Sequence, residues 1–161
     1  MRWMFRMLAG IGLPVDDRHA GAGGAPLQVG ALPFAFDAGG GVRVLLVTAR
    51  RSGRWIVPKG WPVRGLTLAE SAAKEAGEEA GVSGVIGGVI GRIDADRAVP
   101  GSAPSLLIHA LHVDKEHADW PERKQRRRRW LTREEAAEQV ASPALAAMVL
   151  RFDPACGSPT R

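Results

Sequence analysis

The stretch GLTLAESAAKEAGEEAGV (residues 65–82) constrains the fold more than any other part of this 161-residue chain. Thr67 and Glu70 have the spacing of a capping box, which predicts a helix beginning at Leu68. Gly81 is placed to end that helix, because glycine readily adopts the left-handed conformation that follows a helix C-terminus. At about 100° per residue, four alanines share one face, which predicts close packing against a core. These alanines are Ala69, Ala72, Ala76 and Ala80.

The same helix carries a crowd of glutamates, although the chain has a net charge of +5. Glu75, Glu78 and Glu79 lie within an arc of roughly 100° beside the alanine face. Like-charge pairs three or four residues apart cost a few tenths of a kcal/mol each, and Gly77 costs about 1 kcal/mol relative to alanine. Clustered carboxylates can be stabilised by a hard cation such as Mg²⁺. The alternative is a solvated acidic face, which is common on surface helices.

Cations surround the N-terminal end of the expected helix. The loop PKGWPVRG (residues 58–65) contains Lys59 and Arg64, and Arg54 lies just upstream. The N–H groups and the dipole of a helix N-terminus also favour anions. Carboxylates that hold a metal, with cations close by, suit a phosphorylated small-molecule substrate whose phosphate chain is bridged by the metal.

Residues 60–82 resemble the Nudix box, G-x5-E-x7-R-E-U-x-E-E-x-G-U, in which U is a bulky apolar residue. Leu66 stands where the box has its first glutamate, Lys74 replaces the arginine, and Ala76 is small for a U position. Glu70 is expected to pair with Lys74 in place of the missing glutamate, since the two are four residues apart. The matching positions are Gly60, Glu75, Glu78, Glu79, Gly81 and Val82.

The resemblance extends beyond the box. Residues 28–34, 54–62 and 120–140 are similar to the diphosphoinositol-polyphosphate and dinucleoside-polyphosphate hydrolase branch. This implies a Nudix-type α/β/α sandwich with a mixed central sheet over residues 28–152. It also implies pyrophosphohydrolase activity, with Mg²⁺ or Mn²⁺ assisting the attack of water on phosphorus. The substrate would be a nucleoside diphosphate linked to another group, a dinucleoside polyphosphate or a diphosphoinositol polyphosphate.

The resemblance also implies roles for individual residues. Glu75 and Glu79 would be the main metal ligands, with Glu78 beside them and the Gly60 carbonyl as a neutral ligand. The general base stays open between a box glutamate and two residues outside the box, Glu116 and Glu122. The residues expected to contact phosphate are Arg54, Lys59 and Arg64, for which the alternative is a solvated surface cation.

The departures at Leu66 and Lys74 leave a second function open. A non-catalytic Nudix-like module could bind a phosphorylated ligand or RNA with the same fold. The three box glutamates are all present, which favours the enzyme.

The basic run RKQRRRR (residues 123–129) has three interpretations. If it is a strand, Arg127 and Arg129 share one face and are expected to line the binding site of a highly phosphorylated substrate, while Arg126 and Arg128 point the other way. The run could also protect an edge strand from aggregation, or give incidental nucleic-acid affinity.

The remaining sequence predicts strands alternating with a few helices. Thr132 with Glu135, and Ser142 with Pro143, mark the starts of two later helices. Residues 1–27 are expected to be a flexible N-terminal extension, although arginines before a short apolar stretch also resemble a signal peptide. Residues 153–161 are expected to be a disordered tail. The predicted strands are residues 28–36, 42–50, 54–60, 85–95, 105–114 and 126–132.

The single cysteine, Cys156, can form no internal disulfide, which suits a reducing cytoplasm. No segment approaches the ~18 apolar residues of a membrane span. We therefore expect a cytoplasmic monomer or homodimer that does not cross a membrane.

Overall fold

The computed structural model describes residues 26–96 and 98–157. Strands are interleaved with a few helices along the chain, as the sequence predicts. The strands are β1 (Leu27–Phe36), β2 (Val42–Thr48), β3 (Trp55–Ile56), β4 (Lys59–Gly60), β5 (Val82–Ile93), β6 (Ser105–Glu116) and β7 (Arg128–Leu131). The helices are α1 (Leu68–Glu75), η1 (Ala76–Ala80), α2 (Arg133–Gln139), α3 (Pro143–Arg151) and η2 (Pro154–Gly157).

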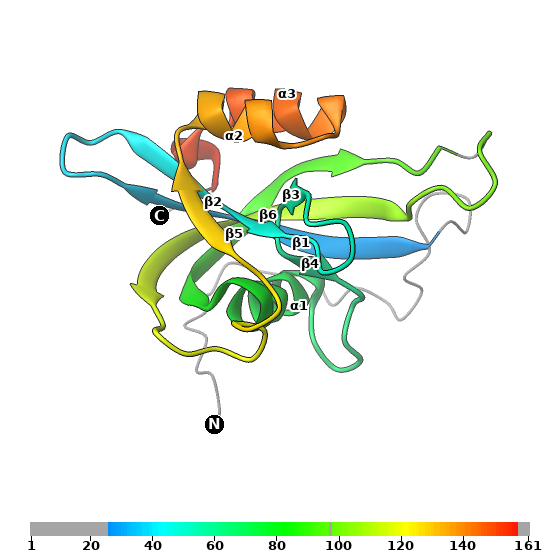
Figure 1. Cartoon of the computed structure of the whole chain (residues 1–161), viewed down its shortest axis with the longest axis horizontal. Helices are drawn as coiled ribbons and strands as arrows, with labels where there is room; N and C mark the ends of the chain where they lie inside the picture. Colours follow the sequence, from blue (N-terminus) through cyan, green and yellow to red (C-terminus); the bar gives the residue numbers. More distant parts are fainter. Residues whose placement is uncertain (1–25, 97, 158–161) are drawn as a thin grey trace.

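The strands form one mixed sheet in the order β3-β2-β1-β6-β5. β1 and β6 are parallel, with Val29 opposite Leu107, whereas the other pairs of named strands are antiparallel. β4 pairs with β1, and β7 pairs with β2 as the expected edge strand. Figure 1 shows α1 below the sheet and α2 and α3 above it. The predicted α/β/α sandwich is therefore confirmed.

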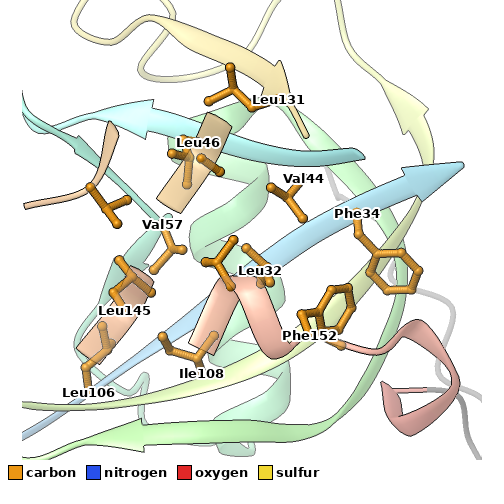
Figure 2. Close-up of a cluster of buried hydrophobic side chains, with 14 residues drawn as sticks. Leu32, Phe34, Val44, Leu46, Val57, Leu106, Ile108, Leu131, Leu145 and Phe152 are labelled. Carbon is orange, nitrogen blue, oxygen red and sulfur yellow. The ribbon is translucent and has the colours of Figure 1, made fainter. Parts of the chain in front are cut away.

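The sheet has a hydrophobic cluster on each face, because alternate strand residues point to opposite sides. Leu32 and Leu46 face α2 and α3, whereas Ala31 and Leu45 face α1. Figure 2 shows the α2/α3 cluster, in which Leu145 comes close to the sheet side chains. The labelled members of this cluster are Leu32, Phe34, Val44, Leu46, Val57, Leu106, Ile108, Leu131, Leu145 and Phe152.

Small side chains bring α1 close to the sheet. Ala72, Ala76 and Ala80 are fully buried and lie in one cluster with Val29 and Val47, as the alanine face predicts, whereas Ala69, the fourth alanine of that face, is only half-buried. The side chain of a larger residue would hold the helix farther away. Glu75 and Glu79 consequently lie close to residues 59 and 60 before the helix, where burial partly removes their charges from water.

The ends of the domain differ from the sequence prediction. β1 begins at Leu27, inside the predicted extension, whose residues 1–25 lie outside the described part of the chain. The prediction of a disordered tail is wrong for residues 154–157, which form the short helix η2. Asp153 Oδ1 accepts a hydrogen bond from Ala155 N at 2.9 Å and so caps this turn. Among the described residues, no helix is long and apolar enough to cross a membrane.

Candidate active site

The helix that carries the glutamates is capped at its start as expected. The Thr67 side chain accepts a hydrogen bond from Glu70 N at 3.1 Å, and Glu70 Oε2 accepts one from Thr67 N at 2.7 Å. The buried hydroxyl of Ser71 accepts a hydrogen bond from Val63 N at 3.0 Å, which fixes the preceding loop to the helix. The loop and helix are therefore held as one unit.

The second half of this helix departs from the regular α-helix that the sequence predicts. After Glu75 the chain continues as a π-helix, η1, which contains Gly77, a poor helix former. Gly81 ends it with φ 64°, in the left-handed conformation predicted for this glycine. Wide turns of this kind occur often at functional sites. Two adjacent carboxylates lie in this turn: the Glu78 side chain is 37% exposed and that of Glu79 is 7% exposed.

Glu75 lies against the backbone of Gly60. A Cβ built on Gly60 would be 2.5 Å from both carboxylate oxygens of Glu75, so any larger residue at this position would displace the end of the Glu75 side chain. Burial, followed by the neighbouring Glu78 carboxylate, raises the pKa of Glu75. The Nudix box therefore predicts correctly that Glu75 and Gly60 lie side by side. The carbonyl group of Gly60 could add a neutral oxygen to the carboxylate of Glu75 as a metal ligand.

Glu79 is the most deeply buried of the three carboxylates. Its Oε2 accepts a hydrogen bond from Lys59 N at 3.1 Å, and its Oε1 accepts one from Arg126 Nη2. Burial raises the pKa of Glu79 to about 7, although Arg126 and the Lys59 amide both act to lower it. A cation of higher charge at this carboxylate would favour its ionised form.

Lys74 pairs with Glu78, not with Glu70. Lys74 Nζ lies 2.5 Å from Glu78 Oε1, whereas Glu70 is occupied by the cap at Thr67. The expectation of a Glu70–Lys74 pair is therefore wrong. Both glutamates are four residues from Lys74, so spacing alone does not distinguish them.

The arginine run lies with its faces reversed from the prediction. Arg128 is opposite Val47, which faces α1, and Arg129 is opposite Leu46, which faces α2 and α3. Arg127 lies over the ring of Trp55, which packs against the α2/α3 cluster. The structure therefore does not bring Arg127 and Arg129 beside the glutamates, although Arg127 lines the same cavity as Arg126.

Arg126 and Arg128 instead contact the glutamate helix. Arg126 pairs with Glu79 and also donates from Nε to Glu122 Oε2 at 2.5 Å. Arg128 Nη1 donates to the carbonyl oxygens of Ala80 and Gly81 at 2.9 and 3.1 Å. Sequence reasoning missed both roles. The spacing of Glu122 and Arg126, four residues apart with the glutamate first, is a signal for a helical turn that would bring the two together.

Some of the other predicted site residues contact neighbouring side chains, and others are exposed to solvent. The side chain of Lys59 donates to Gln28 Oε1 at 2.7 Å, and burial lowers its pKa. Arg54 and Arg64 are exposed, and neither is paired with a glutamate of the helix in the described part of the chain. Of the two base candidates outside the box, Glu122 joins the cluster through Arg126, while Glu116 lies 3.5 Å from Arg128 instead.

Comparison with known proteins identifies the family. The model of the NUDIX domain matches residues 26–152. The chain belongs to the Nudix hydrolase family. Nudix hydrolase 16, mitochondrial, from Arabidopsis thaliana is 33% identical over 135 residues, which cover 74% of this chain and 75% of that protein.

Solved structures share the Nudix fold. A NUDIX hydrolase from Nitrosomonas europaea has a TM-score of 0.64 at 17% identity, covering 83% of this chain and 91% of that one. A C. elegans Ap4A hydrolase has a TM-score of 0.60 at 18% identity, covering 78% and 94%. The NUDIX domain of Shewanella oneidensis NrtR, complexed with ADP ribose, has a TM-score of 0.62 at 13% identity, covering 77% and 85%. At these identities the likeness is one of fold.

Nudix hydrolases generally use divalent metal ions, and the residues present here fit such an ion. The carboxylates of Glu75 and Glu79 are both partly removed from water, and their raised pKa values show that their charges are incompletely compensated. Hard cations prefer carboxylate and carbonyl oxygens, and Gly60 supplies backbone beside Glu75. In the part of the chain that the structure describes, however, no three acidic, histidine or cysteine side chains already converge on one point.

A cationic cavity adjoins this cluster. It has a volume of about 280 Å³ and lies between the β2–β3 turn and the segment before β7. Arg50, Arg123 and Lys124 line it together with Arg126, the partner of Glu79. The Nudix glutamates thus have a positively charged recess beside them, and much of its lining comes from residues 123–127 of the basic run that the sequence singles out.

Proposed function

We propose that this protein is a metal-dependent pyrophosphohydrolase that cleaves a diphosphate linkage in a phosphorylated small molecule by attack of water on phosphorus. The observation that carries this proposal is the pairing of two partly buried Nudix carboxylates, Glu75 and Glu79, with a cationic cavity. Carboxylates suit a metal, and the cations beside them suit phosphate oxygens.

Different residues would bind the metal ion and act as the general base. Glu75, Glu79 and the Gly60 backbone would hold Mg²⁺ or Mn²⁺, with Glu78 close by. When bound, such an ion neutralises charge on phosphate oxygens and lowers the pKa of coordinated water. Glu122 is the candidate base outside the box, because it lies in the same network as Glu79 through Arg126.

We assign phosphate binding to cations around the cluster, of which Lys59 is half-buried and Arg54 and Arg64 are exposed. Lys59 and Arg64 belong to the loop before α1, and Arg54 precedes β3. Arg123 and Lys124 in the cavity could hold further phosphate groups, since both are exposed and close to Arg126. This arrangement favours substrates with more than two phosphates, namely dinucleoside polyphosphates and diphosphoinositol polyphosphates, over a simple nucleoside diphosphate derivative.

A substrate panel tests the proposal. The purified protein is assayed with Mg²⁺ or Mn²⁺ against Ap4A, ADP-ribose and a diphosphoinositol polyphosphate, following phosphate products by chromatography. Glu79→Gln should reduce turnover by on the order of 100-fold or more, because losses at supporting metal residues alone reach about 10–100-fold. Glu134→Gln removes the same charge from an exposed position on α2 and should leave turnover unchanged.

Two results would contradict the proposal. One is hydrolysis that persists in EDTA or in Glu79→Gln. The other is tight binding of panel compounds without any hydrolysis, which would favour the non-catalytic ligand-binding module.

A further inference from the structure

Each nitrogen of the Arg126 guanidinium donates a hydrogen bond inside the protein. Its Nη2 donates to Glu79 Oε1, its Nε donates to Glu122 Oε2 at 2.5 Å, and its Nη1 donates to the Thr48 carbonyl oxygen at 3.0 Å. The side chain is 7% exposed. Arginine cannot lose its proton in a protein, so this is a permanent positive charge within the carboxylate cluster.

Neighbouring donors also engage the other carboxylates of the cluster. Both oxygens of Glu79 are occupied, one by Arg126 and the other by the Lys59 amide, and Glu78 is paired with Lys74. Within residues 26–96 and 98–157 no group of three potential ligand side chains is ready for a metal ion. A cation that binds Glu79 must therefore share the two carboxylate oxygens with Arg126 and the Lys59 amide, or displace one of them.

We propose that Arg126 is a built-in counter-ion that competes with the divalent cation for Glu79. Arg126 neutralises the buried carboxylate in the metal-free protein, where an uncompensated charge would be strongly destabilising. The divalent cation takes over this task when it binds, and Arg126 leaves Glu79. This inference rests on the metal site of the proposed function.

The cationic cavity can accommodate the Arg126 side chain after it leaves Glu79. Arg126 also lines the cationic cavity, together with Arg50 and Lys124. A guanidinium freed from Glu79 can form paired hydrogen bonds with a phosphate, for which its planar fork is well suited. Metal loading would thus prepare a phosphate contact beside the metal. It follows that a divalent cation and a phosphate ligand should strengthen each other's binding.

Metal affinity measured without substrate tests the competition. Metal-stripped wild-type protein, Arg126→Gln and Arg129→Gln are titrated with Mn²⁺ in a calorimeter at constant ionic strength. Arg126→Gln should bind Mn²⁺ about 5-fold or more tightly than wild type, in the range of ordinary coupling between sites. Arg129→Gln removes an equal charge from the same segment, on the face away from Glu79, and should differ by less than about 2-fold. Unchanged or weaker Mn²⁺ binding by Arg126→Gln would overturn the proposal.

A second measurement covers the case in which Arg126→Gln does not fold. Arginine Nε–Hε signals of the wild-type protein are recorded by NMR during titration with Mg²⁺, and the Arg126 signal is identified by its loss in Arg126→Lys. The proposal expects this signal to shift strongly as Mg²⁺ saturates, since its bond to Glu122 is part of the displaced network. A signal that stays in place through saturation would show that Arg126 is a fixed structural pair.

These outcomes are separate from those of the proposed function. Both measurements are made without substrate, so a protein that hydrolyses nothing can still show competition at Glu79. Conversely, metal-dependent hydrolysis together with an unmoved Arg126 signal would leave the proposed function standing and remove only this inference.

Discussion

Gly60 lies so close to Glu75 that a Cβ at residue 60 would be 2.5 Å from both carboxylate oxygens. The glycine therefore determines where this carboxylate can sit. Gly60→Ala should move Glu75 and reduce turnover at least about 10-fold, the scale seen when supporting residues of a metal are lost. Steady-state kinetics with saturating Mg²⁺ measure this effect.

Gly88→Ala is the matched control for this change. A Cβ at Gly88 meets no atom within 4 Å, so the variant should keep wild-type turnover. Equal losses in the two variants would mean that the effect at Gly60 is not specific to Glu75.

The stability of the metal-free protein should fall as the pH rises from about 4.5 to about 7. Glu79 has a pKa of about 7 in the folded protein against an ordinary value of 4.5, so between these values the folded state retains a proton that the unfolded state has lost. The contribution is present below pH 4.5 and lost above pH 7, and the difference in pKa corresponds to about 3 kcal/mol. Urea unfolding in EDTA at pH 5 and pH 8 measures the change.

Glu79→Gln should be less sensitive to pH over this interval, because the titrating group is gone. Glu134→Gln, at an exposed position on α2, should retain the wild-type fall. If wild type and Glu79→Gln lose the same free energy of unfolding between the two pH values, the raised pKa of Glu79 is not its source.

The capping box of α1 should contribute stability without help from Lys74. Glu70→Ala leaves Thr67 N without its side-chain partner and should lower the free energy of unfolding by about 1 kcal/mol. Glu135→Ala breaks the same motif at α2 and should cost a similar amount while sparing turnover. A loss in Glu70→Ala that disappears in a Lys74→Ala background would show that Glu70 and Lys74 are coupled after all; urea unfolding of the four variants decides this.

Arg128 should position the end of the glutamate helix. Its guanidinium donates to the carbonyl oxygens of Ala80 and Gly81 and lies 4.0 Å from the ring of Trp120. Arg128→Lys keeps the charge but loses the fork, and should lower the free energy of unfolding by about 2 kcal/mol. Thermal or urea unfolding measures this loss.

Arg129→Lys is the matched control on the opposite face of the same strand. Arg129 is exposed, so its replacement by lysine should change the free energy of unfolding by less than about 0.5 kcal/mol. Comparable losses at Arg128 and Arg129 would argue against a capping role for Arg128.

Local patterns in the sequence predict much of this fold. The two capping boxes, the Ser142–Pro143 start of α3 and the left-handed Gly81 all depend on residues a few positions apart, and all are confirmed. The buried alanine face of α1 follows from helix periodicity in the same way. The Nudix box adds the long-range placement of Gly60 beside Glu75, because its spacing encodes a known loop and helix.

The sequence does not predict the partner of a residue that has two possible partners at equal spacing. It also does not predict which face of the sheet a strand residue points to. Lys74 has a glutamate four residues away in each direction, and only the capping hydrogen bond of Glu70 decides that the partner is Glu78. Alternation correctly separates Arg126 and Arg128 from Arg127 and Arg129. It does not say which pair faces α1, because that depends on the register of β7 against β2.

The cationic cavity should matter most for highly phosphorylated substrates. Arg123 and Lys124 are exposed on its rim, close to Arg126 and the Nudix glutamates. Changing both to Ser should raise KM for a diphosphoinositol polyphosphate or a dinucleoside polyphosphate several-fold, with little effect on KM for ADP-ribose. The difference should shrink at high salt, since exposed charges are screened within about 8–10 Å at moderate ionic strength.

Arg129 and Arg151 provide a control pair for the cavity. Both are exposed, on β7 and α3, and changing both to Ser removes the same total charge on the side of the sheet away from the glutamates. Initial-rate kinetics across the substrate panel, at low and high salt, compare the two double variants. If both pairs raise KM equally for every substrate, the effect comes from the overall positive charge of the protein, and the cavity has no part in selecting polyphosphates.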